Sequence, residues 1–344
     1  MISPEALKDR FVGALLGTMV GDAIGAPVEG WDCARMAEQL DKLRYLPKAE
    51  RELATAVLGL ITGGEVLPGG ARYTDDTQMA IGVAQALIDD GGIVPKNLAR
   101  HFASNFQPWR GYGPGAYGVL DALKQGRPWD EPARQVFGGR GSYGNGAAMR
   151  VGPLGAFYWD ADVETIREQA RLASLPTHTH THGIEGAAVV ALAVAGALQQ
   201  AANEAEELDV AALLAFVRSG VTDEVYLKKL DQVEGFLTAE PEPCVVAARL
   251  GTDLTATLSV PAALFAFLSR WDSLPDCILY AVRLGGDADT IAAMAGAMAG
   301  AFHGASAIPK NWLAALENGP QGRDFVIQLA EALYNRASQA ESRS

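Results

Sequence analysis

The sequence predicts an all-α protein. Segments rich in Ala, Leu and Met repeat their apolar residues at helical spacing, and the 344 residues contain no convincing strand-like alternation of apolar and polar residues. Hydrophobic residues make up 49% of the chain, which is enough for a sizeable core. The clearest expected helices cover residues 11–24, 77–88, 184–199, 210–218, 260–268 and 290–303.

The first expected helix, residues 11–24, carries a glycine at every fourth position, at Gly13, Gly17 and Gly21, and Gly25 directly after it continues this spacing. Each glycine costs about 1 kcal/mol of helix stability relative to alanine, so a regular stripe needs a structural reason. Such stripes let the backbones of two helices approach closely. Pro27 ends this helix.

The helix at 77–88 follows a Thr-Asp-Asp-Thr motif, and the helix at 184–199 is followed by a charged surface turn at 201–208. The shorter apolar runs at 210–218 and 260–268 show the same helical spacing. The last helix, 290–303, carries its own stripe of Gly296, Gly300 and Gly304. We therefore expect the two striped helices to lie deep in the bundle, each against a close neighbour.

No shift in composition and no low-complexity linker marks a boundary along the chain. The sequence therefore predicts a single domain over residues 1–344, with the motif-bearing core at about 10–315.

Two short acidic motifs, at residues 74–77 and 287–290, have the same composition. Each offers two carboxylates and at least one hydroxyl but no Cys or His, which is the oxygen-only set preferred by hard cations such as Mg²⁺. If folding joins the motifs, four carboxylates repel one another unless cations lie between them. The hypothesis is a two-metal site. In the alternative interpretation, each motif only caps the N-terminus of a helix.

Other candidate site residues lie in loops. Glu29 follows the first helix and could act as a general base or as a gate that moves when substrate binds. Gly-rich loops at 111–115 and 141–146 are typical of backbone amides that cradle phosphates. Phe137 and Tyr143 could stack on a base or flank a ribose.

Residues 177–182 alternate Thr and His and hold three of the five histidines. Only a strand would place all three imidazoles on one face, and no cysteine or acidic cluster adjoins them to complete a zinc shell. This disfavours a zinc site and favours contact between His178 alone and a substrate phosphate or ribose.

The formal net charge of −13 disfavours nonspecific binding to nucleic acid or to an anionic membrane. The N-terminus shows no export signal, and the apolar stretch at 291–302 is too short to span a bilayer. Cys33, Cys244 and Cys277 are scattered, so we expect neither a disulfide framework nor a zinc knuckle. These features predict a cytoplasmic protein, and nothing in the sequence demands more than a monomer.

Five separated motifs together resemble the ADP-ribosylglycohydrolases, in family order across roughly residues 10 to 315. Within the family, the Ser-Tyr-Gly-Asn-Gly and Tyr-Thr-Asp-Asp-Thr sequences most resemble the serine-type (type three) ADP-ribosylhydrolases. The motifs are residues 21–29, 73–80, 111–113, 141–150 and 285–292.

The resemblance implies a compact orthogonal helical bundle with a dinuclear site for two Mg²⁺ ions, for which Mn²⁺ is an alternative. Glu29 matches the mobile catalytic glutamate of the serine-type branch, and we expect Asp75 and Asp76 to take part in catalysis as well. The implied metal ligands are Thr74, Asp75, Asp76, Asp287, Asp289 and Thr290. The implied contacts to ADP-ribose are Gly113, Phe137, Ser142, Tyr143, Gly144, Asn145, His178 and Leu254.

The expected activity is hydrolysis of the glycosidic bond between ADP-ribose and an acceptor. The resemblance favours serine-linked protein ADP-ribose, then poly(ADP-ribose) or O-acetyl-ADP-ribose. The expected partner is an ADP-ribosylated protein or conjugate, with no membrane and with nucleic acid only as an ADP-ribosylated substrate. Three alternatives stay open: an arginine-type hydrolase, a non-catalytic ADP-ribose-binding protein, and a two-metal phosphohydrolase.

Overall fold

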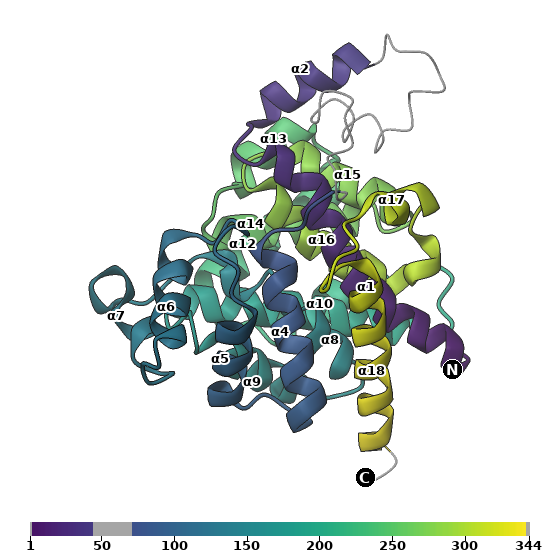
Figure 1. The fold of residues 1–344 in the computed structure, drawn as a ribbon. Coiled ribbons are helices and arrows are strands. Elements are labelled where there is room, and N and C mark those ends of the chain that lie inside the picture. Colours follow the sequence, from purple (N-terminus) through teal and green to yellow (C-terminus); the bar gives the residue numbers. More distant parts are fainter. Residues whose placement is uncertain (1, 44–70, 342–344) are drawn as a thin grey trace.

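The computed structural model describes residues 2–43 and 71–341, and this part of the chain is helical (Figure 1). It contains no β-strand within those residues, only isolated bridges between Ala71 and Leu316 and between Gly144 and Thr255. The predicted all-α fold is confirmed.

The helices are α1 (Pro4–Gly25), α2 (Cys33–Leu43), α4 (Asp75–Asp90), α5 (Pro95–Asn105), α6 (Pro114–Lys124), α7 (Pro132–Gly139), α8 (Gly152–Phe157), α9 (Val163–Ser174), α10 (Thr181–Ala202), α11 (Val210–Ser219), α12 (Glu224–Ala239), α13 (Pro243–Leu250), α14 (Ala256–Ser269), α15 (Leu274–Leu284), α16 (Ala288–His303), α17 (Lys310–Ala315) and α18 (Arg323–Glu341). Short 3₁₀ turns are η1 (Ala26–Val28), η3 (Asn145–Ala147) and η4 (Ala305–Ala307).

Helix α1 starts as its sequence dictates. The Ser3 hydroxyl accepts a hydrogen bond from the Ala6 amide at 3.2 Å, and Pro4 and Glu5 occupy the first turn. From Phe11 onward every residue of the helix is buried. A helix that is apolar all round belongs in the interior of a bundle.

Two helices, α1 and α10, have the length and hydropathy of a membrane span. In the fold, 89% of the apolar window within the helical segment Pro4–Val28 and 83% of the window in α10 are buried inside the protein. Their composition is therefore accounted for by a position in the core.

The glycine stripes of α1 and α16 face each other. A Cβ built on Gly17 would lie 2.0 Å from the carbonyl oxygen of Gly296, and one on Gly300 would lie 1.9 Å from the carbonyl oxygen of Gly13. No other residue type leaves room for this approach. The expected close neighbour of each striped helix is thus the other striped helix, and this pair forms the centre of the fold.

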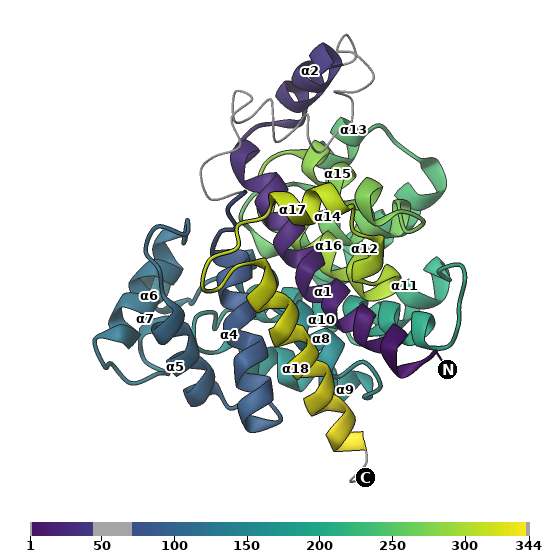
Figure 2. The ribbon, with the colours of Figure 1, turned by 45° about the vertical axis from the view of Figure 1, so that its right-hand side comes forward.

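The other helices surround this pair (Figures 1 and 2). Helices α10, α14 and α15 pack on α16, and α18 runs along α1 and α4. Helices α5, α6 and α7 form an outer group that packs on α4 through α5. A single cluster of buried hydrophobic residues reaches from Phe11 to Ala337.

Helix α2 is joined to α13 by a disulfide between Cys33 and Cys244. The expectation that the scattered cysteines form no disulfide was wrong. The two residues are 211 positions apart, so only the packing of α2 beside α13 brings them together. The cysteines therefore no longer argue for a reducing compartment. Cys277 is a free, buried thiol.

Candidate metal centre and substrate cavity

The two acidic motifs occupy the first turns of α4 and α16, which meet in the structure. Thr74 caps α4 through a hydrogen bond that its Oγ1 accepts from the Asp76 amide at 3.4 Å, and Asp287 occupies the cap position of α16. Thr290 Oγ1 donates to Asp76 Oδ2 at 3.3 Å and so links motifs 214 residues apart. The motifs therefore begin helices and also converge in space, and the two-metal site stays a prediction.

Two glycines fix the start of α16. Gly285 and Gly286 have φ of +72° and +73°, a region that favours glycine, and a Cβ on Gly286 would lie 2.1 Å from the Thr252 carbonyl oxygen. Gly286 exchanges backbone hydrogen bonds of 2.7 Å with Gly30 and Trp31. This pairing docks the loop that carries Glu29 against the Asp287 motif.

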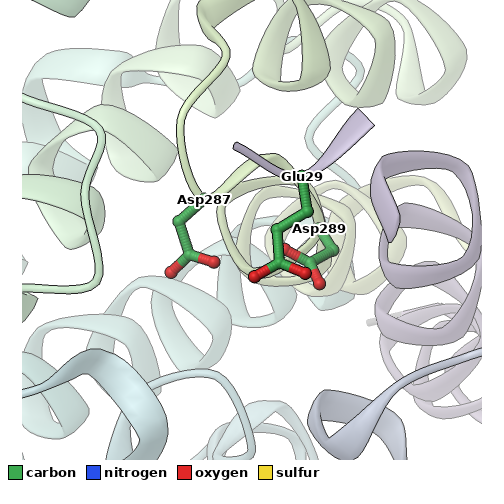
Figure 3. Close-up of side chains that lie close together, drawn as sticks. All are labelled: Glu29, Asp287 and Asp289. Carbon is green, nitrogen blue, oxygen red and sulfur yellow. The ribbon is translucent and has the colours of Figure 1, made fainter. Parts of the chain in front are cut away.

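Three carboxylates consequently meet at one point (Figure 3). Glu29, Asp287 and Asp289 each contribute an oxygen, and these oxygens lie within 4.8 Å of one another. Asp287 and Asp289 are buried, whereas Glu29 lies at the exposed rim. Such a cluster could hold a metal ion.

Burial and mutual repulsion raise the pKa values of these carboxyls. The pKa values of Asp75, Asp76 and Asp289 lie well above the usual range because the groups are buried and because other carboxylates face them. The pKa of Glu29 is raised by burial and by Asp287. Without a compensating positive charge, ionising these carboxyls together is therefore unfavourable.

The donor set fits a hard divalent cation. Asp76 is only 1% exposed, and its Oδ1 has no hydrogen-bond partner within residues 2–43 and 71–341. A buried, unpartnered carboxylate oxygen is costly unless a cation or a water meets it. The predicted ligand side chains are all Asp or Thr and supply only oxygen, as Mg²⁺ prefers.

Asp22 was missing from the predicted site, although it supports the metal motif. It lies buried in α1 and accepts hydrogen bonds from the amides of Thr74 (2.8 Å) and Thr77 (3.0 Å) and from Thr77 Oγ1 (2.6 Å). Burial raises its pKa to about 6 despite these bonds. The sequence did contain one indication of this supporting role, because Asp22 is an aspartate within an otherwise apolar stretch of helix.

A second set of contacts holds Tyr73, the residue directly before the acidic motif at 74–77. Glu317 accepts a hydrogen bond from the Tyr73 amide at 3.0 Å and pairs with Arg110, which donates to the Tyr73 carbonyl at 2.7 Å and stacks on its ring. No local sequence pattern announces this triad, because its members are far apart in the chain.

A cavity of about 630 Å³ opens above the acidic cluster, and every predicted metal-ligand and substrate-contact residue lines it. The lining also includes Tyr112, Met149, Asp253 and Thr255, to which the sequence assigned no role in the site. The structure thus brings the predicted residues together, while their roles as ligands and substrate contacts stay predictions.

An aromatic pair stands at the rim. Phe137 and Tyr143 are 48% and 39% exposed, and their rings stack with centroids 5.4 Å apart. Phe137 has a φ of +52°, unusual for a bulky residue, where α7 breaks before Gly138. Leu254 is 60% exposed, and its carbonyl accepts from the Asn145 amide at 3.0 Å.

Asn145 connects the glycine loop to the acidic cluster. Its side-chain nitrogen donates to Asp287 Oδ2 at 2.5 Å and to Ser259 Oγ at 2.9 Å. Both amide hydrogens are therefore engaged by the protein. This geometry makes Asn145 a positioning residue for Asp287.

His178 is buried beneath the glycine loop. Thr177 Oγ1 accepts from Arg150 at 2.8 Å and lies 2.7 Å from His178 Nδ1. Arg150 takes one lone pair of the Thr177 hydroxyl, whose proton is free to be donated to Nδ1, and in that tautomer the ring hydrogen lies on Nε2. Burial and Arg150 lower the pKa of His178 to about 3, so the ring is neutral, and in this tautomer it offers an Nε2–H donor beside Gly144 and Gly146.

The other two histidines of the run lie outside the metal cluster. His180 caps α10, with its Nδ1 accepting from the His182 amide at 3.1 Å. His182 Nε2 lies 3.5 Å from Asp223. N-capping of α10 therefore explains His180, one residue of the Thr/His run at 177–182, for which the sequence offered no explanation.

Known proteins resemble this chain over almost all of its length. The family model described as ADP-ribosylglycohydrolase matches residues 3–343. The ADP-ribosylhydrolase ARH3 of Mus musculus is 34% identical, with 96% of this chain and 93% of that protein aligned. The uncharacterized protein YegU of Escherichia coli is 31% identical, with 87% and 89% aligned.

A solved structure has the same fold. The ADP-ribosylglycohydrolase-related protein complex superposes with a TM-score of 0.67 at 28% identity, covering 97% of this chain and 99% of that one. The family match, the ARH3 relatives and the shared fold together show that the chain belongs to the ADP-ribosylglycohydrolase family. It is a glycosidase that hydrolyses ADP-ribose linkages.

Proposed function

We propose that this protein is a Mg²⁺-dependent hydrolase that releases ADP-ribose from serine-linked protein conjugates. One observation carries the proposal: both acidic motifs and Glu29 converge on one cavity, which also holds a neutral histidine donor and an aromatic pair. The similarity to ARH3 proteins supports the serine-type assignment over the arginine-type one.

The residues that would hold the metal ions are Thr74, Asp75, Asp76, Asp287, Asp289 and Thr290. When bound, Mg²⁺ would neutralise these carboxylates and polarise hydroxyl oxygens of the distal ribose. Asn145 and Asp22 would keep Asp287 and the start of α4 in place while the charges are compensated.

Glu29 is the group best placed to move a proton. Its carboxylate lies at the rim of the cluster, and its pKa is raised by burial and by Asp287. We assign it to take a proton from the water that attacks ribose C1″, or to give one to the departing serine oxygen. Its position on a loop after η1 also allows it to swing aside when substrate enters.

The remainder of the cavity would bind the rest of ADP-ribose. His178 Nε2–H and the backbone of the loop at 142–146 face the same space and suit the diphosphate oxygens. Phe137 and Tyr143 offer flat apolar faces for the adenine, with Leu254 close to the glycine loop.

The test is release of free ADP-ribose from serine-linked and arginine-linked ADP-ribosyl peptides, with Mg²⁺ and with a chelator. We expect Mg²⁺-dependent release from the serine peptide alone. Release from the arginine peptide alone would replace the serine assignment by the arginine type. Release of AMP or inorganic phosphate in place of ADP-ribose would indicate a two-metal phosphohydrolase.

Binding of ADP-ribose without turnover of either peptide would contradict the proposal and favour a binding role. Metal preference is tested by replacing Mg²⁺ with Mn²⁺ in the serine-peptide assay. Unchanged release in chelator would overturn the metal requirement.

A further inference from the structure

A second hollow, of about 800 Å³, lies between α5 and the chain that connects α6 to α7. Among the residues that the structure describes, its charged lining consists of the cations Lys96, Arg100, Lys124 and Arg127 and the carboxylate Asp130. Four positive charges against one give a local balance of +3, in a chain whose net charge is −13. The net charge of this basic cleft is therefore opposite in sign to that of the whole protein.

Most of these cations have no carboxylate partner. Within residues 2–43 and 71–341, neither Lys96, Arg100 nor Lys124 has a carboxylate oxygen within 4.0 Å, and all three are exposed. Arg127 pairs with Glu131 at 3.1 Å, where both side chains are about half exposed. Asp130 is itself engaged by Arg134 at 3.7 Å.

The placement of Lys96 and Arg100 is unfavourable for the helix that carries them. They are four residues apart on one face of α5, where like charges destabilise a helix. Lys96 lies in the first turn, where the helix dipole disfavours a cation and where α5 has no acidic residue. An anion in the cleft would relieve both effects.

The basic cleft continues toward the substrate cavity. An intermediate hollow of about 430 Å³ shares Arg127 with the basic cleft. The same hollow shares Pro114, Gly115 and Phe137 with the substrate cavity. The three hollows thus adjoin along α6 and α7, which lie beside α5 in both views (Figures 1 and 2). This series of hollows meets the substrate cavity at the end where Phe137 lies.

We propose that the basic cleft binds the pyrophosphate of an adjacent unit of an oligo(ADP-ribose) chain whose cleaved unit lies in the substrate cavity. This rests on the proposed function, which puts the adenine at Phe137 and Tyr143. In such a chain the next unit is attached to the ribose of the adenosine, so it leaves the cavity at the adenine end. The exposed cations meet its phosphates, and Trp129 supplies a flat wall of the cleft.

The test measures affinity for fluorescently labelled ADP-ribose monomer and tetramer by anisotropy, in chelator so that turnover stops, across a salt series. We expect the tetramer to bind about tenfold tighter than the monomer or better. Four phosphate contacts correspond to a slope of log affinity against log salt of about −3, and Lys96→Gln/Arg100→Gln should reduce it to about −1.5. Gln keeps the helix propensity of α5.

The matched control is Lys228→Gln/Lys310→Gln, which removes two exposed cations on α12 and α17, away from the cleft. It should leave the tetramer slope unchanged. Release of ADP-ribose from a serine-linked monomer peptide should be the same in wild type and in both variants.

Equal affinity of wild type for monomer and tetramer would overturn the proposal, as would an unchanged slope in Lys96→Gln/Arg100→Gln. Single-stranded DNA with the same number of phosphates, if it competes as well as the tetramer, would overturn it in favour of a general polyanion site. Failure of the monomer-peptide assay would instead count against the proposed function, because tetramer binding is measured without turnover.

Discussion

The side-chain nitrogen of Asn145 donates a hydrogen bond to Oδ2 of Asp287, which lies 142 residues later in the chain. The same nitrogen donates to Ser259 on α14. One amide therefore couples the glycine loop of the substrate cavity to the acidic cluster. It also lowers the otherwise raised pKa of Asp287, because it stabilises the charged carboxylate.

Asn145→Ala should therefore weaken metal affinity, although we do not place Asn145 among the metal ligands. Residues that orient a metal ligand typically contribute about 10- to 100-fold to metal affinity or activity. The measurement is the Mg²⁺ concentration that gives half-maximal release of ADP-ribose, together with kcat and KM at saturating Mg²⁺.

Ser259→Ala is the control for this prediction. It removes the second partner of Asn145 and leaves the bond to Asp287 in place, so the Mg²⁺ requirement should shift much less. Equal Mg²⁺ requirements in wild type and Asn145→Ala would contradict the positioning role.

The metal-free protein should lose stability as the pH rises. Carboxyls with raised pKa values keep their protons in the folded state when the unfolded chain has already released them, so their contribution is full below the unfolded pKa and disappears as the pH passes the folded pKa. For Asp22, a folded pKa of about 6 against 3.8 corresponds to about 3 kcal/mol lost between about pH 4 and pH 6.

Buried His178, with a pKa of about 3, has the opposite effect below about pH 6.5, because the unfolded chain takes up a proton there that the folded protein does not. Thermal unfolding in chelator from pH 6.5 to pH 9 therefore checks the expectation for the carboxyls whose pKa values are raised well above the usual range, with a parallel series in Mg²⁺. The Tm should fall with rising pH in chelator, and Mg²⁺ should restore it most at the alkaline end. A Tm that rises with pH in chelator would contradict the raised pKa values.

Asp76→Asn should have opposite effects on stability and on activity. The change removes one of several buried carboxylates that repel one another, so the Tm in chelator at neutral pH should increase by a few degrees. The same change removes a metal-ligand candidate, so release of ADP-ribose should be abolished. A fully active variant would show that Asp76 is not a required metal ligand, and a variant destabilised in chelator would show that Asp76 is not held in a repulsive cluster.

Gly17→Ala should strongly destabilise the fold. Its methyl group would lie 2.0 Å from the Gly296 carbonyl, and neither backbone can move without separating α1 from α16. Overpacking a core typically costs about 1–3 kcal/mol, and a clash with backbone lies at the upper end or beyond. Chemical denaturation measures the loss, or loss of soluble folded protein shows it directly.

Gly235→Ala is the matched control for the glycine prediction. Gly235 lies inside α12, and a Cβ there would meet no atom within 4 Å. The substitution should therefore raise the free energy of unfolding by about 0.5–1 kcal/mol. If both alanine variants behave alike, the close approach of α1 and α16 does not determine stability.

The sequence predicted the buried helices better than the exposed ones. Apolar runs identify α1, α10 and α16 because these helices are buried on all sides. Amphipathic helices such as α9 and α12 were not among the expected ones, because charged faces interrupt their apolar runs. Their N-caps were visible signals, since Asp162 and Asp223 accept hydrogen bonds from the first turns.

The site could be predicted where its residues lie in short motifs. Thr74 and Asp289, for example, belong to short local motifs whose residue types predict metal binding without a structure. Asp22 and Glu317 act on the same site through contacts that span 52 and 244 residues, and no local pattern encodes such contacts. The basic cleft was hidden by the net charge, because its cations come from separate segments of a strongly acidic chain.

The disulfide between Cys33 and Cys244 gives the last prediction. Cys244 is exposed, so a dithiol reductant can reach the bond, and reduction would release α2 from α13. A bridge between residues 211 apart constrains the unfolded chain, and disulfides typically contribute about 2–4 kcal/mol. Dithiothreitol should therefore lower the Tm of the wild-type protein but not that of Cys244→Ser.

The buried thiol provides the control for this experiment. Cys277→Ser leaves the bridge in place, so its Tm should still respond to dithiothreitol. Alkylation followed by mass spectrometry should label Cys33 and Cys244 only after reduction. If the native protein is already labelled at both residues without reductant, the bridge does not form in solution and the Tm difference should vanish with it. Because Glu29 lies only four residues before Cys33, hydrogen exchange of this loop should also increase on reduction if the bridge helps to hold it against Gly286.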